Sequence, residues 1–495
     1  TFQFRFIPTT NGENWDDDAN WTCGHYPNAT NAEASVGVPT TLKKNATYRN
    51  IHINSNDISV AYLAFTDGGK TNRIDTGDFG GNLVFDGGTH EIPPNQFPNI
   101  NATGYSKSAR THTEFVITNG ASVTMVQNAT FVFGNDYPAS GGDTYAAKTL
   151  HVLVDGESVL TFGSSFFNTG GSKMTVDVKN GSTLTMPTSS TAFWPGKRNA
   201  QEQTGDCSTG IVNVVRSMLK VATTGSAGLG SDKDDSSAYG ELNLSDHSEA
   251  EFWWQLGIQG RLFECKRGLL SIRGGSRFSA AQLTGTSLAR LEADGGCFRY
   301  LPRDGVTDCL YGFGSAKIGA KGFVIDSNGT KGITIRQSFS NLGEESGVLI
   351  LTGSDAKTLA GTETDVDTIA VAQGTMAFAA DVSADSSVIV TNGATFKVAN
   401  GASVTSDAKS VAPITAPKTA LYLETGSHFY VGAGVKNTVK KLCLDGVQKE
   451  AGTYTGETED KGIVLQPMRR YSGAETFYTG ILNVLRGPGS MILVR

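Results

Sequence analysis

The stretch that decides the fold is residues 346–404, which read SGVLILTGSDAKTLAGTETDVDTIAVAQGTMAFAADVSADSSVIVTNGATFKVANGASV. In its first short run Val348, Ile350 and Thr352 alternate with leucines. A period of two is typical of β-strands, because successive side chains point to opposite faces. Turns such as Asn392-Gly393 supply the positive φ angles that a sharp corner needs. No segment of helical period interrupts the stretch, so it predicts an all-β fold.

The same local pattern recurs along the chain. Each copy has an alternating run, a two-residue turn, a small or hydroxyl residue and a second alternating run. The copies are VITNGASVTM (116–125), VLVDGESVLTF (152–162), VDVKNGSTLTM (176–186), LSIRGGSRFSA (270–280), VIVTNGATFKVA (388–399) and LYLETGSHFYV (421–431). Self-similarity of this kind indicates a repeat architecture.

Two architectures fit this pattern. In a sandwich of hairpins the two runs would pair antiparallel. In a parallel β-helix each run would stack on the next coil, about 4.8 Å away. The chain has 495 residues, 60 glycines and no evident domain break, which favours coils of about 20–30 residues. We therefore predict a single elongated right-handed parallel β-helix, or β-solenoid, with capped or strand-exchanging ends.

The predicted organisation has three parts. Residues 1–47 form an N-terminal strand and cap, residues 48–435 form the β-solenoid with loop insertions, and residues 436–495 form a closing segment with terminal strands. The insertions expected are residues 135–148, 196–210 and 223–239, which are polar and rich in Gly and Ser.

Charge and hydropathy limit the partners and the compartment. The formal net charge is −7, from 41 basic and 48 acidic residues, and the basic residues are scattered, so we expect no nucleic-acid partner. No apolar run of about 20 residues is present, so we expect no transmembrane segment. Thr1 stands where an initiator Met would, which predicts an exported chain whose signal has been removed. The predicted location is extracellular or the cell surface.

Six cysteines form an even set without a CxxC pair, which disfavours zinc and allows disulfides. Cys297 and Cys309 bracket a loop that contains Pro and Gly, and they are the predicted disulfide. Free buried thiols are the alternative.

Several segments resemble a known family. They are residues 312–341, Gly347 to Gly353, Thr358 to Thr362 and Ile369 to Met376, an entry segment from Trp15 to Trp21, and closing stretches at residues 451–456 and 479–485. Together they are similar to the autotransporter-associated β-strand repeats of bacterial extracellular proteins. The resemblance implies a secreted or surface parallel β-solenoid and no particular reaction. The quoted segments include no counterpart of the family's translocator domain, so we do not expect anchoring by that route.

Catalytic signatures are absent from the sequence. The seven histidines are dispersed without HExxH spacing, and no G-x-S-x-G motif occurs. We predict no catalytic residues and no cofactor other than a cation. Asp232, Asp234 and Asp235 offer oxygen ligands that would suit Ca²⁺, and the alternative for them is a solvated loop.

Eight N-x-S/T sequons mark candidate glycosylation sites. They are Asn20, Asn28, Asn45, Asn101, Asn128, Asn180, Asn243 and Asn328. A chain rich in Asn, Ser and Thr also produces such triplets by chance.

Two functions of different classes follow from these patterns. The first is a structural protein that forms a homo-oligomer or homopolymer, as a filament, sheath or surface layer, because stacked strand edges template further strands. The residues expected at that assembly contact are Phe2, Phe4, Phe6, Met491, Ile492, Leu493 and Val494. Self-capped ends are the alternative for these residues.

The second function is a carbohydrate-active enzyme (a polysaccharide lyase or glycoside hydrolase) or a glycan-binding adhesin. It predicts an extracellular polysaccharide partner in a groove lined by Trp253, Trp254 or Tyr300 with charged neighbours. Arg299, Arg303, Asp304 and Asp308 could contact an anionic glycan or form an ordinary ion-paired loop.

Overall fold

The structure is a computed structural model that divides into two compact units, Thr1–Ser271 (unit 1) and Ile272–Arg495 (unit 2). It describes residues 3–6, 13–14, 18–20, 24–26, 28, 33–36, 48–52, 58–59, 62–65, 71–75, 83–86, 89–92, 100–101, 112–125, 131–134, 149–162, 166–168, 173–196, 209–231, 238–255, 259–329, 332–354, 356–360, 363–373, 375–379, 389–390, 395–398, 403–406, 420–423, 428–432, 436–444, 446–455, 458–460, 463–468 and 481–484. Across these residues the secondary structure is β, apart from a 3-10 turn, η1 (Asp18–Asn20).

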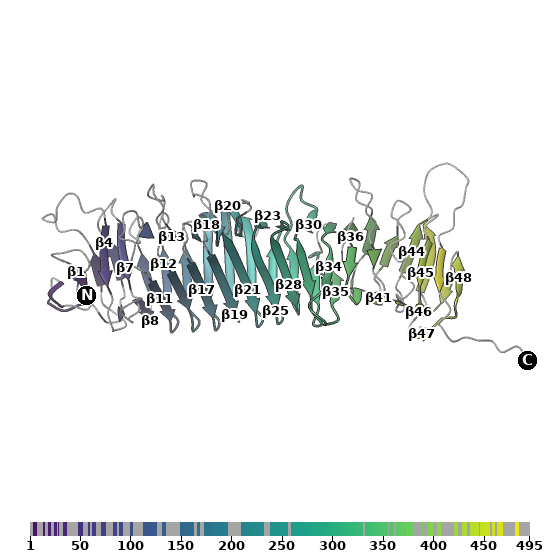
Figure 1. Cartoon of the computed structure of the whole chain (residues 1–495), viewed down its shortest axis with the longest axis horizontal. Helices are drawn as coiled ribbons and strands as arrows, with labels where there is room; N and C mark the ends of the chain where they lie inside the picture. Colours follow the sequence, from purple (N-terminus) through teal and green to yellow (C-terminus); the bar gives the residue numbers. More distant parts are fainter. Residues whose placement is uncertain are drawn as a thin grey trace, which may run out of the picture. The chain divides into compact units, whose positions relative to one another are not determined.

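Unit 1 contains a parallel sheet whose neighbouring strands are far apart in sequence. Its strands, in spatial order, are β5 (Ile58–Ser59), β8 (Leu83–Asp86), β11 (His112–Thr118), β14 (Thr149–Val154), β17 (Lys173–Lys179), β19 (Thr209–Val215) and β21 (Tyr239–Ser245). Several of them lie side by side in Figure 1. Lys173 pairs with Thr149, 24 residues earlier (173 − 149), and with Thr209, 36 residues later (209 − 173). Neighbouring strands are therefore one full circuit of the chain apart.

Two further rows of parallel strands belong to unit 1. The first row contains β9 (Thr89–Ile92), β12 (Ser122–Met125), β15 (Val159–Phe162), β18 (Thr183–Trp194), β20 (Met218–Leu229) and β22 (Glu249–Gln255). The second contains β10 (Ile100–Asn101), β13 (Phe131–Gly134), β16 (Phe166–Asn168), the second halves of β18 and β20, and β24 (Leu262–Cys265). A short strand β23 (Gln259–Gly260) pairs antiparallel with β22.

The earliest strands of unit 1 form two small parallel sheets. One has the order β1 (Gln3–Phe6), β3 (Glu33–Val36) and β6 (Tyr62–Phe65). The other has the order β2 (Glu13–Asn14), β4 (Tyr48–His52) and β7 (Thr71–Asp75).

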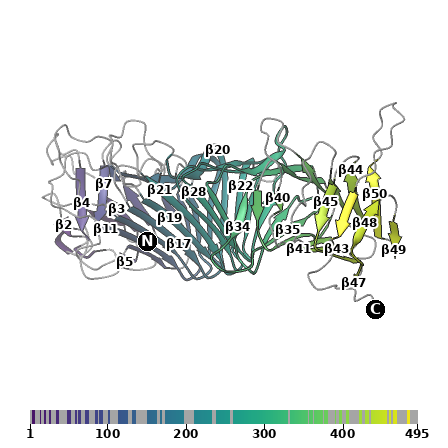
Figure 2. The ribbon, with the colours of Figure 1, turned by 45° about the vertical axis from the view of Figure 1, so that its right-hand side comes forward.

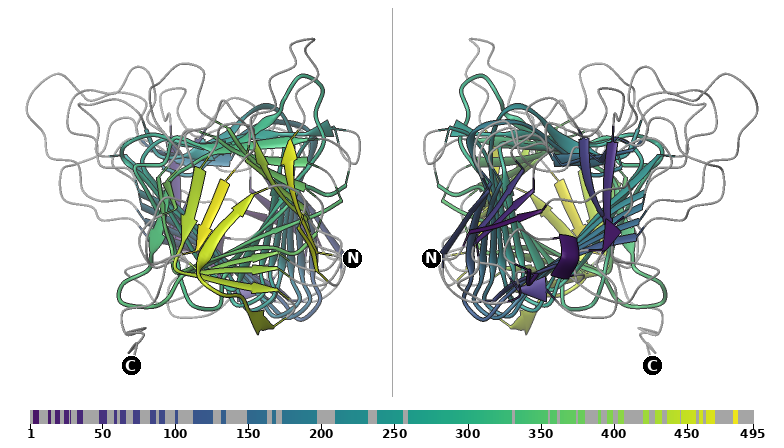
Figure 3. Two further views of the ribbon diagram at one scale, coloured as in Figure 1. Left: turned by 90° about the vertical axis from the view of Figure 1, so that its right-hand side faces the viewer. Right: turned by 90° about the vertical axis from the view of Figure 1, so that its left-hand side faces the viewer.

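Unit 2 repeats the arrangement with three rows of parallel strands. The first row is β26 (Arg277–Ala280), β29 (Gly296–Tyr300), β32 (Phe323–Asp326), β35 (Val348–Thr352), β38 (Thr368–Val371), β41 (Thr395–Val398), β43 (Ala420–Leu423) and β46 (Lys441–Leu444). The second is β27 (Gln282–Gly285), β30 (Asp308–Tyr311), β33 (Ile333–Arg336), β36 (Ala356–Ala360), β39 (Thr375–Ala379), β42 (Ser403–Ser406), β44 (His428–Gly432) and β50 (Ile463–Met468). The third is β28 (Ala289–Asp294), β31 (Ser315–Ile318), β34 (Phe339–Asn341), β37 (Glu363–Asp365) and β40 (Ile389–Val390). Viewed along the stacking direction, the strands of a row lie one behind another (Figure 3).

Alternation of side chains places the core inside the coils. In β17 the residues Met174, Val176 and Val178 are fully buried, and the residues between them face outward. The parallel register stacks apolar side chains on apolar side chains, so that Val176 lies between its register neighbours Val152 and Val212. Each inward-facing position of a strand therefore forms one column of apolar side chains through the stacked coils.

A corner follows the first sheet of unit 1 in every coil between β11 and β22. Residues with positive φ form it, among them Asn119, Asn180 and Asp246 with φ of 54°, 53° and 54°. The corners are bonded to one another, since Gly120 N donates to Gly156 O and Gly181 N donates to Arg216 O, each at 2.8 Å. The positive φ angles explain why asparagine and glycine recur at the turns of the sequence repeat.

A buried serine follows each of the later four corners, and these residues form a serine ladder, Ser158, Ser182, Ser217 and Ser248; the first corner is followed by Ala121. The amide of Ser158 donates to Ser182 Oγ at 3.1 Å, that of Ser182 to Ser217 Oγ at 3.2 Å, and that of Ser217 to Ser248 Oγ at 3.3 Å. Three of these serines are fully buried and Ser217 is 9% exposed. The ladder gives each of these three buried amides an acceptor, and the amide of Ser182 also donates to Lys179 O at 3.2 Å.

Three strands at the C-terminal end of unit 2 run opposite to the rest. They are β47 (Val447–Gln448), β48 (Gly452–Thr455) and β49 (Thr458–Asp460), and they follow one another in sequence. They pair antiparallel with β46, with β51 (Ile481–Val484) and with β50, respectively. β51 in turn pairs parallel with β45 (Lys436–Val439). We call residues 447–460 the reversed coil; its strands are labelled in Figure 2.

The structure confirms an all-β chain with parallel sheets. The predicted loop at residues 223–239 is partly wrong, because Thr223 to Leu229 belong to β20. Small residues are needed there for close packing rather than for a turn: a Cβ on Gly228 would lie 2.1 Å from the carbonyl oxygen of Glu264. Residues 135–148, 197–208 and 232–237 lie outside the described part of the chain.

Candidate functional site

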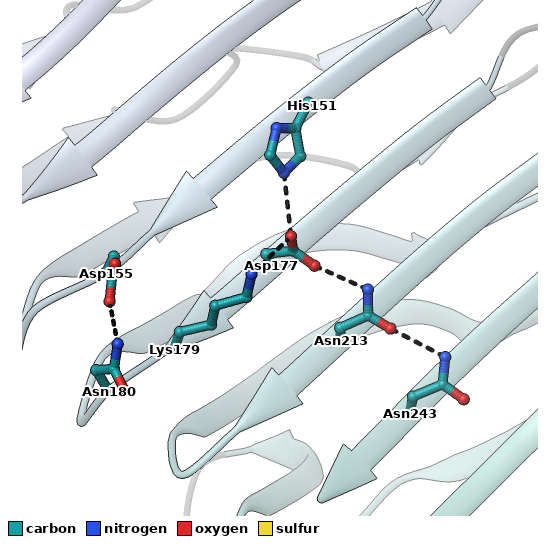
Figure 4. Close-up of polar contacts among 7 residues, drawn as sticks. All are labelled: His151, Asp155, Asp177, Lys179, Asn180, Asn213 and Asn243. Carbon is teal, nitrogen blue, oxygen red and sulfur yellow. Dashed lines mark hydrogen bonds and ion pairs between the residues drawn. The ribbon is translucent and has the colours of Figure 1, made fainter.

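The most developed polar cluster is on the outward face of the first sheet of unit 1 and is centred on Asp177 (Figure 4). Asp177 Oδ2 accepts from His151 Nε2 at 3.1 Å and lies 3.1 Å from Lys179 Nζ. Asp177 Oδ1 accepts from Asn213 Nδ2 at 2.8 Å, and Asn213 Oδ1 accepts from Asn243 Nδ2 at 3.0 Å. We call these five residues the Asp177 network.

Strand register builds this network. Asp177 and Asn213 are register partners, as are Asn213 and Asn243, so their outward side chains stand in one column across β17, β19 and β21. His151 of β14 lies across from Thr175, two residues before Asp177, and reaches Asp177 diagonally. Parallel pairing with a constant register therefore brings together four residues that span 92 positions (243 − 151).

Asp177 is held as a carboxylate. The hydrogen bond from His151 lowers its pKa most, those from Asn213 and Lys179 add to the effect, and partial burial opposes them, leaving the pKa of Asp177 well below its ordinary value. Its side chain is only 15% exposed. A carboxyl with such a low pKa cannot donate a proton near neutral pH, so Asp177 is unsuited to the general-acid role in glycoside hydrolysis.

The amides extend the network towards a second carboxylate. Asn243 Nδ2 also donates to Glu241 Oε2 at 3.3 Å, and the hydroxyl of Tyr239 donates to Glu241 Oε1 at 2.8 Å. The outward polar groups of β17, β19 and β21 thus bind one another. Mutual satisfaction of this kind fixes side chains and is typical of a rigid surface.

The aromatic residues proposed for a groove lie in different environments. Trp253 and Trp254 of β22 are half-buried; Trp253 Nε1 donates to Glu251 Oε2 at 3.3 Å, and the guanidinium of Arg261 lies 4.7 Å from the ring centre of Trp254. Tyr300 is fully buried and its hydroxyl donates to Val306 O at 2.7 Å. Tyr300 therefore cannot line a groove, and that expectation is wrong.

The charged residues near Tyr300 form ion pairs and hydrogen bonds. Arg299 Nε lies 3.0 Å from Asn328 Oδ1 and 3.6 Å from Asp326 Oδ2. Arg336 Nε lies 3.2 Å from Asp308 Oδ2. These contacts agree with the alternative in which the charged residues form an ordinary ion-paired loop.

The predicted disulfide is not formed. Cys297 and Cys309 are both free thiols. Cys297 alternates with the buried Gly296 and Phe298 of β29 and so faces outward, whereas Cys309 is buried in β30, a strand of another row. The two cysteines bracket the loop in sequence, but Cys297 faces outward from β29 and Cys309 faces inward from β30.

The sequons are placed in unlike surroundings. Asn180 is exposed at a corner and donates to Asp155 Oδ1 at 2.7 Å, whereas Asn243 is bound within the Asp177 network and Asn328 accepts from Arg299. Asn28 is exposed. Asn20 ends η1 and Asn101 ends β10, and their side chains are not described. Asn45 and Asn128 lie outside the described residues.

Other predicted site residues fall largely outside the described chain. Phe4 and Phe6 belong to β1, where only the backbone is described. Phe2, Met491, Ile492, Leu493 and Val494, and the aspartates Asp232, Asp234 and Asp235, lie outside the described residues. Among described residues no group of three or more His, Cys, Asp or Glu could hold a metal ion. No described helix is long and apolar enough to cross a membrane.

Sequence reasoning missed the Asp177 network, although a signal for it exists. Counted back from the ladder serine of each repeat, Asp177 and Asn243 stand at position −5 (182 − 177 and 248 − 243), and Asn213 stands at −4 (217 − 213). The different offset arises because the corner before Ser217 contains one positive-φ residue, Arg216, instead of two. Aligning the repeats on this serine, with a one-residue gap in the corner before Ser217, would have placed the three side chains in one column.

Comparison with known proteins identifies no relative: no protein-family model, no curated protein and no solved structure matches the chain.

Proposed function

We propose that the chain is a single right-handed parallel β-solenoid with a structural role. In this proposal it is a secreted protein that self-associates through its terminal strands, as a subunit of an extracellular filament, sheath or surface layer. The resemblance to autotransporter-associated repeats supports the extracellular location, and the parallel rows of strands in both units support the solenoid.

The strands at the ends of three sheets are the observation that supports self-association. β1, β2 and β5 each stand at the end of their sheet and have a single parallel neighbour among the described strands. The outer edge of such a strand presents backbone N–H and C=O groups that can pair with another chain. A contact between unlike surfaces that does not close on itself produces a fibre.

The Asp177 network agrees with a structural role. Its carboxylate, imidazole and amides are bound to one another across four strands instead of converging on an open position. Such a surface stiffens the sheet.

Negative-stain electron microscopy and light scattering on the full chain test the proposal. We expect regular assemblies that are lost when residues 1–7, which include β1, are deleted. Deletion of residues 487–495 tests the proposed contact at the C-terminal end separately. A protein that stays monomeric at all concentrations, or assembly unchanged by both deletions, would refute association through the terminal strands.

A second candidate is a carbohydrate-active enzyme or a glycan-binding adhesin, and Trp253 favours it. Trp253 is half-buried on the outward side of β22, and Glu251 on the same strand fixes its indole nitrogen. An indole held in this way can stack on a sugar ring. Binding and turnover on a panel of acidic and neutral polysaccharides, compared between wild type and Trp253→Ala, test this candidate. Equal behaviour of the two proteins would exclude Trp253 from glycan recognition.

A further inference from the structure

Two N-x-S/T sequons lie on the stacked strands of unit 1, and their side chains have different surroundings. The first, NGS at residues 180–182, is at the corner after β17, and the second, NLS at residues 243–245, is within β21. Asn180 is exposed, whereas Asn243 is half-buried on the outward face of its sheet. An N-linked glycan is attached to the side-chain amide nitrogen, so the hydrogen bonds of that nitrogen distinguish the two sites.

Asn180 has an N–H bond to spare. Its Nδ2 donates to Asp155 Oδ1 at 2.7 Å (Figure 4), and this is the one hydrogen bond of that nitrogen within the described residues. An amide nitrogen has two N–H bonds, and a glycan replaces one of them. The glycosylated nitrogen would therefore keep the N–H that bonds to Asp155. The neighbouring corners leave room for a sugar, since Glu157 on one side and Arg216 on the other are both exposed.

Asn243 has no N–H bond to spare. Its Nδ2 donates to Asn213 Oδ1 at 3.0 Å and to Glu241 Oε2 at 3.3 Å. A glycan on this nitrogen would remove at least one of these hydrogen bonds and would insert a bulky group into the Asp177 network. If the glycan were added before the chain folds, folding would have to proceed without that hydrogen bond. The folded structure is therefore compatible with a glycan on Asn180 and opposes one on Asn243.

We propose that Asn180 is a glycosylation site of the folded chain and that Asn243 is not. The inference rests on the proposed secretion, because N-linked glycans belong to exported chains. The donor is an oligosaccharide linked to a lipid diphosphate. The amide nitrogen of Asn180 forms a bond to the anomeric carbon of the sugar while the bond from that carbon to the diphosphate breaks. The diphosphate leaves with the electron pair and takes up the proton that the nitrogen loses.

Site-resolved mass spectrometry of the secreted chain tests this inference. The full chain is produced with an export signal in cultured mammalian cells, which attach N-linked glycans to exported proteins. Peptide N-glycosidase then removes the glycans in water labelled with heavy oxygen, so that each glycosylated position acquires the label. Asn180→Gly removes the site at a corner where glycine can adopt the same positive φ. Ser245→Ala is the matched control, because it removes the other sequon and leaves the amide of Asn243 in place.

We expect the label at position 180, the loss of one glycan mass in Asn180→Gly and no loss of glycan mass in Ser245→Ala. A secreted, folded chain without a glycan on Asn180 would overturn the inference, and so would equal occupancy of Asn180 and Asn243. Light scattering on the same material separates this inference from the proposed function. A chain that is glycosylated at Asn180 and stays monomeric at every concentration refutes self-association alone, whereas a chain that assembles without a glycan on Asn180 refutes the glycosylation site alone.

Discussion

Replacing Ser182 by alanine should show how much the serine ladder stabilises the stacked corners. Ser182 is fully buried and its Oγ is the acceptor for the Ser158 amide at 3.1 Å. Alanine fits the space, because Ala121 occupies the equivalent place one coil before Ser158 and is also fully buried. The substitution therefore removes a hydrogen bond without creating a clash. Its cost is that of leaving one buried amide without an acceptor, about 1–3 kcal/mol.

Hydrogen exchange followed by mass spectrometry measures this cost at the site itself. The protection of the Ser158 amide should fall by about 5- to 150-fold, since each 1.4 kcal/mol corresponds to a factor of about ten. Thr183→Ala is the matched control, because Thr183 is the next residue and its side chain faces outward. If Ser182→Ala exchanges like Thr183→Ala, the ladder hydrogen bonds do not stabilise the corners and the reasoning fails.

Three further predictions concern charge, backbone conformation and thiols. Because the pKa of Asp177 in the folded chain is below the unfolded value of about 3.9, the ionised group stabilises the fold above that pH and the contribution is lost as the pH falls towards the folded pKa. Asp177→Asn should therefore lower the free energy of unfolding at pH 7 by about 1.5–3 kcal/mol, and the difference from wild type should shrink below about pH 4 in urea titrations; a pH-independent difference would contradict this origin. Gly230 has φ of 65° and a Cβ there would lie 1.8 Å from the carbonyl oxygen of Arg267, whereas a Cβ on Gly120, with φ of 73°, would meet no atom within 4 Å. Gly230→Ala should cost about 2–5 kcal/mol in denaturant unfolding and Gly120→Ala about 1–2 kcal/mol, and equal losses would refute the packing argument. Burial, with a smaller effect of Asp326, raises the pKa of Cys297 to about 12, and burial raises that of Cys309 as well. Both should resist iodoacetamide at pH 8 in the native protein and react after unfolding without reductant, whereas a disulfide between them would leave both unlabelled.

The strands and corners could be predicted from the sequence because they are local. Alternation of side chains and turns such as Asn180-Gly181 report on a few consecutive residues, and the structure has strands and positive-φ corners at these places. The direction of pairing is not local. A hairpin and a stacked coil have the same short-range pattern, and only partners 19 or more residues away distinguish them, as when Thr375 pairs with Ala356 (375 − 356 = 19).

The candidate site was less predictable for the same reason. The Asp177 network depends on three registers at once, and unequal circuit lengths of 36 and 30 residues (209 − 173 and 239 − 209) hide them from a search at a fixed period. The disulfide prediction relied on closeness in sequence. In a coil two cysteines 12 positions apart (309 − 297) can belong to different walls, as Cys297 and Cys309 do. The burial of Tyr300 was equally hard to predict, because it depends on which residues of β29 face inward and not on the residue type.

The unequal circuits have a consequence for how a chain of this kind can change over generations. Parallel register is kept by coils as short as 19 residues (375 − 356) and as long as 37 residues (149 − 112), so the extra residues are absorbed without disturbing the stacked inward positions. Duplication or loss of one whole coil would lengthen or shorten a unit without altering any inward column, because each coil packs only on its neighbours. Selection could therefore adjust the number of coils independently of the reversed coil that closes unit 2, and related chains should differ in length by whole circuits more readily than by single residues within a strand.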